Sequence, residues 1–143
     1  MTEQTVQLLI DSAKEARKKA YSPYSSFSVG AALLTKSGKC YTGANIENAS
    51  FSPTVCAERV AFFEAIHQGE REFAAIAIVG DDAQNALTAF CPPCGVCRQV
   101  MAEFCDKSFE ILLFDGKKIK RYTLDQLFPV RFALSDEKDE DTV

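Results

Sequence analysis

Residues 56–59 read Cys-Ala-Glu-Arg, and residues 93–97 read Pro-Cys-Gly-Val-Cys. These two stretches offer three cysteine thiolates to one metal ion. Glu58 stands two positions after Cys56 and cannot reach the same ion as a fourth ligand. Hydrolytic zinc sites use three protein ligands and leave the last tetrahedral position open, whereas structural sites usually close with four. The stretches therefore predict a catalytic Zn²⁺ site with Cys56, Cys94 and Cys97 as ligands, and a fold that brings them together.

Both stretches are expected to open a helix. A helix N-terminus presents free backbone N–H groups and the positive end of the helix dipole, which favour a thiolate. Cys97 follows Cys94 by three positions, so the two sulfurs lie on one face of their helix. Glu58 is placed near a water on the metal without coordinating the ion. We expect it to accept and return protons during catalysis.

The rest of the chain alternates helical and strand-like patterns. Helices are expected at 4–20, 56–68, 94–104 and 124–128, and strands at 27–35, 39–46, 73–80, 109–114 and 118–122. In the helix at 56–68, Val60, Phe63 and Ile66 are expected to face inward. Residues 81–90 are interpreted as a loop with some helical tendency. This order implies an α/β fold, a mixed sheet with helices packed on it.

Composition limits the classes of function. With 143 residues and 25% charged side chains, the chain is expected to form a single domain over residues 1–134. The acidic residues 135–143 are predicted to be a disordered tail. The net charge of −4 and the lack of a large basic cluster favour a small molecule over nucleic acid as the partner. No stretch has the length and apolarity of a membrane span.

The six cysteines are interpreted as thiols and metal ligands rather than as a disulfide framework. The start of the chain shows no secretory signal, so a cytoplasmic protein is expected. Cys40 and Cys105 are predicted to be buried, inert thiols. Cys91 leaves a second interpretation open, in which it completes a four-cysteine structural zinc site. The two prolines between Cys91 and Cys94 disfavour that chelating turn.

Three further segments resemble cytidine deaminases, namely residues 21–34, 43–50 and 94–101. The resemblance runs from about residue 13 to residue 132 and is to the small, single-domain enzymes that act on nucleosides. It implies a three-layer α/β/α sandwich with a mixed sheet. It also implies a homotetramer with an all-cysteine zinc site. In members of this type a Cys-Ala-Glu-Arg run recurs, which supports Arg59 as a donor to a ligand sulfur.

The resemblance also suggests how a nucleoside would be held. Asn45 and Glu47 match the residues that hold the ribose 3′-hydroxyl. Phe27 matches the phenylalanine beside the pyrimidine, and the backbone of Ala57 matches the group that reads the base edge. Phe132 matches an aromatic residue that enters a neighbouring subunit's active site.

Two positions depart from the family pattern. Phe128 stands where leucine is usual. Phe51 stands where many relatives have tyrosine, which puts any hydrogen bond by that hydroxyl in question.

The resemblance implies a zinc-dependent enzyme of pyrimidine salvage. It would hydrolyse cytidine and 2′-deoxycytidine to the uridines and ammonia, with Glu58 as the catalytic residue. A deaminase of polynucleotides is a rival, disfavoured by the acidic balance and by Asn45 and Glu47, which need a free 3′-hydroxyl. A deaminase of a cytosine-containing antibiotic is a second rival. The four-cysteine structural module is the rival outside enzymes.

Overall fold

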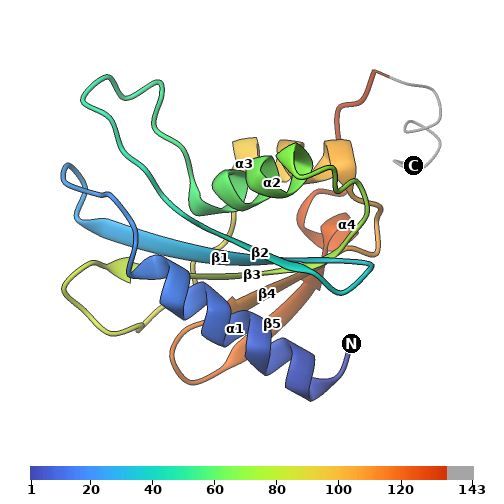
Figure 1. The fold of residues 1–143 in the computed structure, drawn as a ribbon, viewed down its shortest axis with the longest axis horizontal. Helices are drawn as coiled ribbons and strands as arrows, with labels where there is room; N and C mark the ends of the chain where they lie inside the picture. The colour runs from blue at the N-terminus through green and yellow to red at the C-terminus, as the bar shows by residue number, and fades with distance from the viewer. Residues whose placement is uncertain (135–143) are drawn as a thin grey trace.

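A five-stranded mixed sheet forms the centre of the molecule in the computed structural model, which describes residues 1–134 (Figure 1). The strand order is β2-β1-β3-β4-β5, and only β3 and β4 pair in parallel. The elements in chain order are α1 (Glu3–Arg17), β1 (Phe27–Thr35), β2 (Cys40–Ala44), α2 (Ala57–His67), β3 (Phe73–Asp82), α3 (Gly95–Phe104), β4 (Glu110–Phe114), β5 (Ile119–Thr123) and α4 (Leu124–Leu127).

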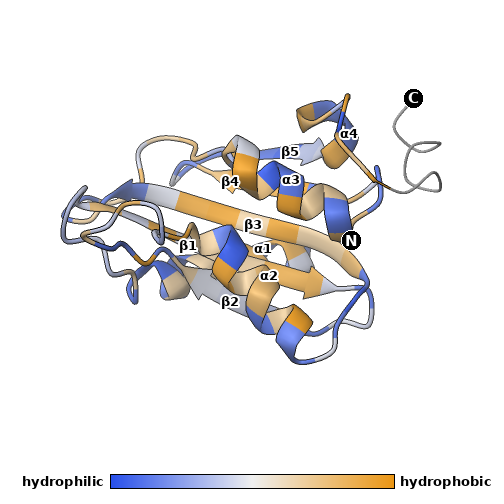
Figure 2. Ribbon diagram, turned by 90° about the horizontal axis from the view of Figure 1, so that it is seen from above, coloured by the Kyte–Doolittle hydropathy of each residue, from blue (hydrophilic) through white to orange (hydrophobic). Residues whose placement is uncertain are grey.

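Helices cover both faces of this sheet, which confirms the predicted three-layer α/β/α sandwich. Helix α1 lies on one face, and α2 and α3 lie together on the other (Figure 1). The central strand β3 is hydrophobic along most of its length (Figure 2) because successive side chains enter opposite layers. Ala75, Ala77 and Val79 pack with the helix α1 core, whereas Ile76 and Ile78 belong to the core beneath α2 and α3.

Two glycines allow helices to approach the sheet closely. A Cβ atom on Gly30 of β1 would collide with the carbonyl of Ala13 in α1. A Cβ atom on Gly43 of β2 would collide with the carbonyl of Ala57 in α2. Both helices therefore rest on backbone rather than on side chains, which sets the height of the first turn of α2 above β2.

An aromatic cluster joins the two helices of the second layer. The ring of Phe62 in α2 lies 5.1 Å from that of Phe73 in β3 and 6.5 Å from that of Phe104 in α3, measured between centroids. Phe62 is fully buried. Because one ring contacts the sheet and the neighbouring helix at once, it holds α2 and α3 side by side.

The structure corrects three details of the sequence analysis. Phe63 is 51% exposed, whereas Ile66 is partly buried against the core as predicted, and the buried residues of α2 are Ala57, Glu58, Ala61, Phe62 and Ala65. The alanines make this face narrow enough to lie against Gly43, and that packing turns Phe63 outward. Strand β3 extends to Asp82, into the segment interpreted as a loop, whose remaining residues 83–90 form no helix, and Cys40 is exposed at the start of β2.

Other expectations hold. Cys105 is buried, as predicted. All described helices and strands were expected, with ends shifted by at most three residues. Within residues 1–134, no helix has both the length and the apolar character needed to cross a membrane. The predicted acidic tail, residues 135–143, lies outside the described part of the chain.

Candidate active site

The topology brings the two cysteine stretches to one edge of the sheet. Strands β2 and β3 both run antiparallel to β1, so they point in the same direction. Each is followed by a helix of the same layer, α2 after β2 and α3 after β3. The two helices consequently start near the same, carboxyl end of the strands, which is where open α/β sheets commonly bind ligands.

Three cysteine sulfurs converge at this edge. Cys56 Sγ lies 3.9 Å from Cys94 Sγ, which in turn lies 3.5 Å from Cys97 Sγ. All three sulfurs lie within 4.8 Å of one another. A tetrahedral zinc ion with bonds of about 2.3 Å needs sulfurs about 3.8 Å apart. The described donor set therefore fits a tetrahedral metal ion bound through three thiolates.

Both helix starts point backbone donors at this cluster. Cys56 is the N-cap residue of α2, and Cys94 is the N-cap residue of α3, each with extended backbone angles. Neither helix has a side-chain cap, so N–H groups of the first turns remain available to the sulfurs. Cys97 lies in the first turn of α3 and is buried. The predicted helix-start placement of the ligands is confirmed.

Arg59 provides positive charge beside the sulfurs. Its Nη2 atom donates a hydrogen bond to Cys56 Sγ at 3.4 Å. Contact with the Cys97 thiol, together with Arg59 and Cys94, lowers the pKa of Cys56, while burial opposes the shift. The cluster is thus biased towards a thiolate at Cys56 by neighbouring donors.

Glu58 is a buried carboxyl in contact with the Cys97 thiol. Its side chain is only 4% exposed on the first turn of α2. Burial raises the pKa of Glu58 to about 7, and the negative charge of Cys56 adds to the shift. A carboxyl in these surroundings can hold a proton near neutral pH, as a group that both accepts and delivers protons must.

Cys91 stands apart from the ligand cluster. Within residues 1–134, the group that could hold a metal comprises Cys56, Cys94 and Cys97 and does not include Cys91. The Cys91 sulfur packs against Gly80 of β3, where a Cβ atom would lie 2.8 Å from it. Burial raises the pKa of the Cys91 thiol to about 12. The geometry does not support the four-cysteine structural site.

Asn45 follows β2 and is almost fully buried. Its Oδ1 atom accepts a hydrogen bond from the Val29 N–H at 2.8 Å, and its Nδ2 atom donates to the Phe27 carbonyl at 2.8 Å. The amide therefore fixes the backbone at the start of strand β1, on either side of Ser28. A carbonyl oxygen has two lone pairs, so Oδ1 keeps one acceptor position for a further donor.

Glu47 organises the turn before β1 and lines a cavity of about 320 Å³ with Tyr24, Ser25, Phe51 and others. Its Oε1 atom accepts hydrogen bonds from the backbone N–H groups of Tyr24 and Ser25 at 2.9 and 3.1 Å, and Oε2 accepts from the Ser25 hydroxyl. Ser25 Oγ in turn accepts from the Phe27 N–H. Ser25 lies in the segment 21–34 that resembles the family, but the sequence analysis assigned it no role.

The remaining residues predicted to contact the substrate differ in how far they are exposed. Ala57 is fully buried in the first turn of α2, next to Cys56. Phe27 is 41% exposed at the start of β1, and Phe132 is 68% exposed near the end of the described chain. The exposure of Phe132 excludes a role as a core aromatic of its own chain. Whether these residues contact a substrate stays a prediction.

Two further residues connect the C-terminal segment to the cysteine cluster. Arg98 Nε donates to the Pro93 carbonyl at 2.9 Å, and its Nη1 donates to the Leu127 carbonyl at 2.6 Å. Gln99 Nε2 donates to the Phe132 carbonyl at 3.0 Å. Sequence reasoning did not assign these roles, because the partners are backbone carbonyls, and those of Leu127 and Phe132 lie 29 and 33 residues along the chain.

Comparisons with known proteins agree with this site. Residues 3–113 match the family model described as the cytidine and deoxycytidylate deaminase zinc-binding region. The chain is 47% identical over 132 residues to a cytidine deaminase of Sporosarcina psychrophila, covering 92% of this chain and 93% of that protein. It is 47% identical over 134 residues to one of Halalkalibacterium halodurans, covering 93% and 98%.

A solved structure supports the same assignment. The crystal structure of cytidine deaminase from Burkholderia pseudomallei has a TM-score of 0.82 and 44% identity, covering 92% of this chain and all of that one. The fold, the convergent cysteines and the sequence similarity extend over most of the chain. The chain belongs to the cytidine and deoxycytidylate deaminase family and is a deaminase of the hydrolase class.

Proposed function

We propose that the chain catalyses the zinc-dependent hydrolysis of cytidine and 2′-deoxycytidine to uridine and 2′-deoxyuridine, with release of ammonia, in pyrimidine salvage. The observation that carries this proposal is the convergence of three cysteine sulfurs beside the buried Glu58. Cys56, Cys94 and Cys97 are the proposed zinc ligands. A zinc ion held by these three sulfurs would supply Lewis acidity, lowering the pKa of a bound water molecule towards neutral pH.

Three thiolates leave a zinc site with a formal charge of −1, which weakens that acidification relative to neutral ligands. Positively charged groups and N–H donors beside the sulfurs would offset this charge and so favour the reaction. Arg59 donates to Cys56 Sγ, and the unoccupied N–H groups at the starts of α2 and α3 face the same cluster. We assign Arg59 to this compensation, acting through the sulfur rather than on the substrate.

Glu58 is the proposed proton carrier of the reaction. It takes a proton from the attacking water as the oxygen bonds to C4 of the pyrimidine, and it delivers that proton to N3. It then moves the remaining hydroxyl proton to the amino group, the C4–N bond breaks, and ammonia leaves as the carbonyl forms. One carboxyl serves both transfers because it never coordinates the metal.

The nucleoside is proposed to lie between the cysteine cluster and the start of β1. Phe27 would lie against the pyrimidine, and the backbone of Ala57 would read the base edge. Asn45 and Glu47 would bind the ribose 3′-hydroxyl with the lone pairs that their backbone contacts leave open. The 320 Å³ cavity beside Glu47 supports the placement of the sugar on this side.

The active enzyme is proposed to be a cytoplasmic homotetramer with shared active sites. Phe132 is exposed in the single chain, and Gln99 of α3 holds its backbone carbonyl by a hydrogen bond. A neighbouring chain could therefore receive this ring. The six cysteines are all free thiols, as is usual in a reducing compartment. The net charge of −4 supports a small substrate rather than nucleic acid.

An absorbance assay for the loss of cytidine tests the function directly. Purified protein should convert cytidine and 2′-deoxycytidine, and a chelator should abolish both activities until zinc is restored. A single-stranded oligonucleotide and a cytosine-containing nucleoside antibiotic serve as the competing substrates. Faster turnover of either one than of cytidine would replace the proposed function with the corresponding rival.

A further inference from the structure

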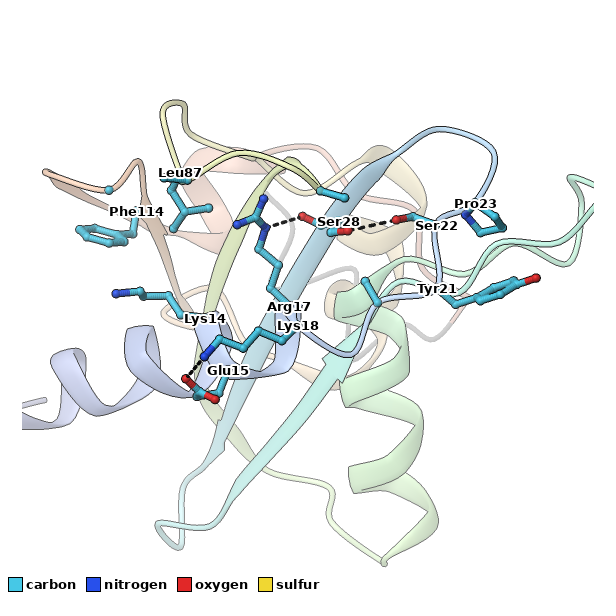
Figure 3. A pocket seen from close by; sticks show the side chains of 14 residues that line it. Lys14, Glu15, Arg17, Lys18, Tyr21, Ser22, Pro23, Ser28, Leu87 and Phe114 are labelled. Carbon is cyan, nitrogen blue, oxygen red and sulfur yellow. Dashed lines mark hydrogen bonds and ion pairs between the residues drawn. The ribbon is translucent and has the colours of Figure 1, made fainter.

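A second, larger cavity lies beside the C-terminal end of α1. It has a volume of about 830 Å³, and none of the predicted site residues lines it. Its walls come from α1, the segment that follows α1, the loop after β3 and the end of β4 (Figure 3). The volume lies within the range of about 300 to 1,000 Å³ that is usual for small-molecule sites.

Basic side chains dominate the charge of this cavity. Lys14, Arg17 and Lys18 line it, and Glu15 is the one acidic residue in its lining. Glu15 pairs with Lys18 at 2.7 Å, but both side chains are at least 70% exposed, so water screens this pair strongly. Within residues 1–134, no carboxylate forms an ion pair with Lys14 or Arg17.

Within residues 1–134, the hydrogen bonds of the Arg17 side chain go to uncharged backbone carbonyls. Its guanidinium donates to the carbonyl oxygens of Ser28, Asp82 and Asn85 at 3.0, 2.7 and 3.0 Å. These contacts fix the loop after β3 against α1 without neutralising the charge. Lys14 and Lys18 are four positions apart and therefore lie on the same face of α1. The cavity thus presents Lys14 and Arg17, which form no ion pair within residues 1–134, and Lys18, whose pair with Glu15 is exposed to water.

The rest of the lining suits an organic group. Phe114, Leu87, Ala83 and Ala86 supply apolar surface, and Lys14 Nζ lies 5.9 Å from the centre of the Phe114 ring. Hydroxyl groups stand on the opposite side, where Ser22 and Ser28 are hydrogen-bonded to each other at 3.0 Å (Figure 3). Two lysine ammonium groups on one helix face, next to an aromatic and aliphatic wall, fit a molecule that carries a phosphate on an apolar skeleton.

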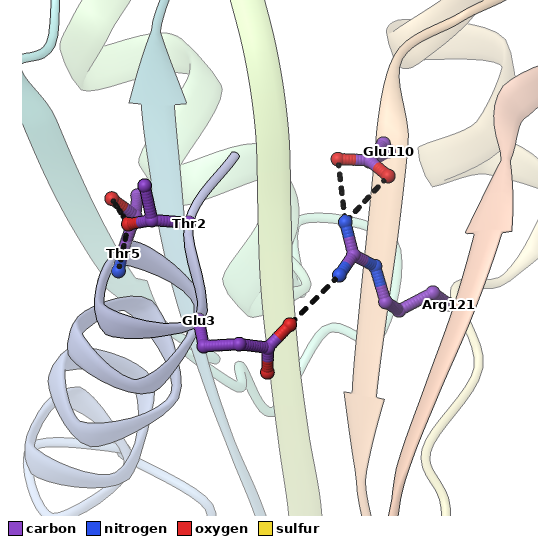
Figure 4. Close-up of polar contacts among 5 residues, drawn as sticks. All are labelled: Thr2, Glu3, Thr5, Glu110 and Arg121. Atoms are coloured by element: carbon purple, nitrogen blue, oxygen red, sulfur yellow. Dashed lines mark hydrogen bonds and ion pairs between the residues drawn. The ribbon is translucent and has the colours of Figure 1, made fainter.

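Helix α1 is a rigid base for these cations because it is anchored at both ends. At its start, Thr2 caps the helix by accepting from the Thr5 N–H. Arg121 lies 3.7 Å from Glu3 and 3.0 Å from Glu110, and so links α1 to β5 and β4 (Figure 4). At its end, the Arg17 guanidinium donates to the carbonyls of Ser28 and Asp82, and so attaches α1 to β1 and to the end of β3.

We propose that this cavity binds a small organic phosphate, with the phosphate at Lys14 and Lys18 and the apolar skeleton against Phe114 and Leu87. The site is distinct from the proposed nucleoside site and does not depend on it. Phenyl phosphate is a suitable probe because it combines one phosphate with one ring. Inorganic phosphate tests the contribution of the skeleton, and benzyl alcohol tests that of the phosphate.

Isothermal titration of the full-length, zinc-loaded protein measures binding. Phenyl phosphate should bind at least about tenfold more tightly than either inorganic phosphate or benzyl alcohol. The double variant Lys14→Gln/Lys18→Gln should weaken phenyl phosphate by about tenfold or more. Lys19→Gln is the matched control, because it removes a lysine charge from the residue after Lys18, which does not line this cavity. This variant should leave binding of phenyl phosphate unchanged. Glu15→Gln should tighten it.

Three results would overturn the proposal: no binding of phenyl phosphate, equal binding of inorganic phosphate, or equal weakening by Lys19→Gln. Arg17 is left unchanged because its contacts hold β1 beside Phe27. The lysine variants should keep full turnover of cytidine, and Cys56→Ala should keep binding of phenyl phosphate. Failure of the phosphate site and failure of the proposed deaminase function are therefore separate results.

Discussion

The cysteine cluster and the nucleoside side of the site are built in different ways. The cluster rests on the first turns of two packed helices, α2 and α3, and its three sulfurs already lie at distances suited to one ion. The nucleoside side depends on turns and a C-terminal segment, and two of its predicted aromatics, Phe27 and Phe132, are 41% and 68% exposed in the single chain.

This difference separates chemistry from specificity. Bond making and breaking at a metal tolerate little displacement, and helix starts fixed by the core provide that rigidity. Recognition of a sugar and a base needs surfaces that can close, and loops and partner segments provide these. Loss of a group on the metal side should therefore affect the rate of the reaction, whereas loss on the nucleoside side should affect the apparent affinity.

Removal of a metal ligand should have the largest effect. Cys94→Ala or Cys97→Ala leaves two sulfurs, so we expect bound zinc to fall from about one per chain to near zero and activity to fall to background. Cys91→Ala is the matched control because its thiol packs against Gly80, outside the cluster. Metal analysis checks both. Zinc loss from Cys91→Ala equal to that from Cys94→Ala would revive the four-cysteine site.

Glu58→Gln should come second. The amide keeps the size of the buried side chain but carries no transferable proton, so kcat should fall by about 10²- to 10⁴-fold while zinc and the fold remain. Glu64→Gln on the exposed side of the same helix should leave kcat unchanged. Steady-state kinetics with metal analysis gives the answer, and a wild-type kcat for Glu58→Gln would remove this residue from the mechanism.

Glu47→Gln tests the nucleoside side. Loss of a hydrogen bond to a charged group costs about 1.5–3 kcal/mol, so KM for cytidine should rise by about 10- to 100-fold with a smaller change in kcat. Wild-type enzyme should correspondingly use 3′-deoxycytidine poorly. Equal turnover of cytidine and its 3′-deoxy analogue would show that the ribose assignment is wrong.

Asn45→Ala should combine two effects. It should raise KM, and it should also lower the free energy of unfolding by about 1–3 kcal/mol, because the Val29 N–H loses its acceptor in a buried position. Denaturant unfolding separates these contributions. Asn45→Asp keeps the acceptor for Val29 and should recover part of the stability. An unchanged unfolding midpoint for Asn45→Ala would contradict the assigned role in holding β1.

Phe132→Ala should have the smallest effect on one chain and the most specific effect in a mixture. Burial of the exposed Phe132 ring by a neighbouring subunit would contribute about 1.5–3 kcal/mol of stabilising free energy to the shared site. Loss of the ring should therefore raise KM for cytidine by roughly tenfold or more, while zinc stays bound. At cytidine concentrations below the raised KM, hybrids of Phe132→Ala with Glu58→Gln should exceed the summed activity of the separate variants, because they pair an intact Glu58 with an intact Phe132 across subunits. An active monomer, or hybrids without recovery, would exclude a shared site.

The sequence predicted much of the fold because the signals were local. The 3.6-residue period of α1 and the short, largely apolar runs of β1 and β3 predicted those elements nearly to their ends. The inward face of α2 was predicted wrongly at Phe63, since apolar residues occur on more than one side of that helix, whereas Ile66 packs against the core. Packing against Gly43 chose the alanine face and left Phe63 exposed.

The ligand spacing, the helix starts and the proton-carrying carboxyl were also readable from the chain, because metal ligation requires particular residue types at short intervals. The links made by Arg98, Gln99 and Ser25 were not readable. Each joins a side chain to a backbone group or to a residue far along the sequence, and any polar residue at the right distance could make them.

The sequence by itself determined which atoms could bind a metal and which carboxyl could move protons, since these properties belong to residue types and spacing. Only the tertiary structure decided that they meet. Strands β2 and β3 point the same way on either side of β1, so the helices after them begin at one edge of the sheet. Long-range strand pairing of this kind depends on the packing of the whole core, which no local pattern encodes.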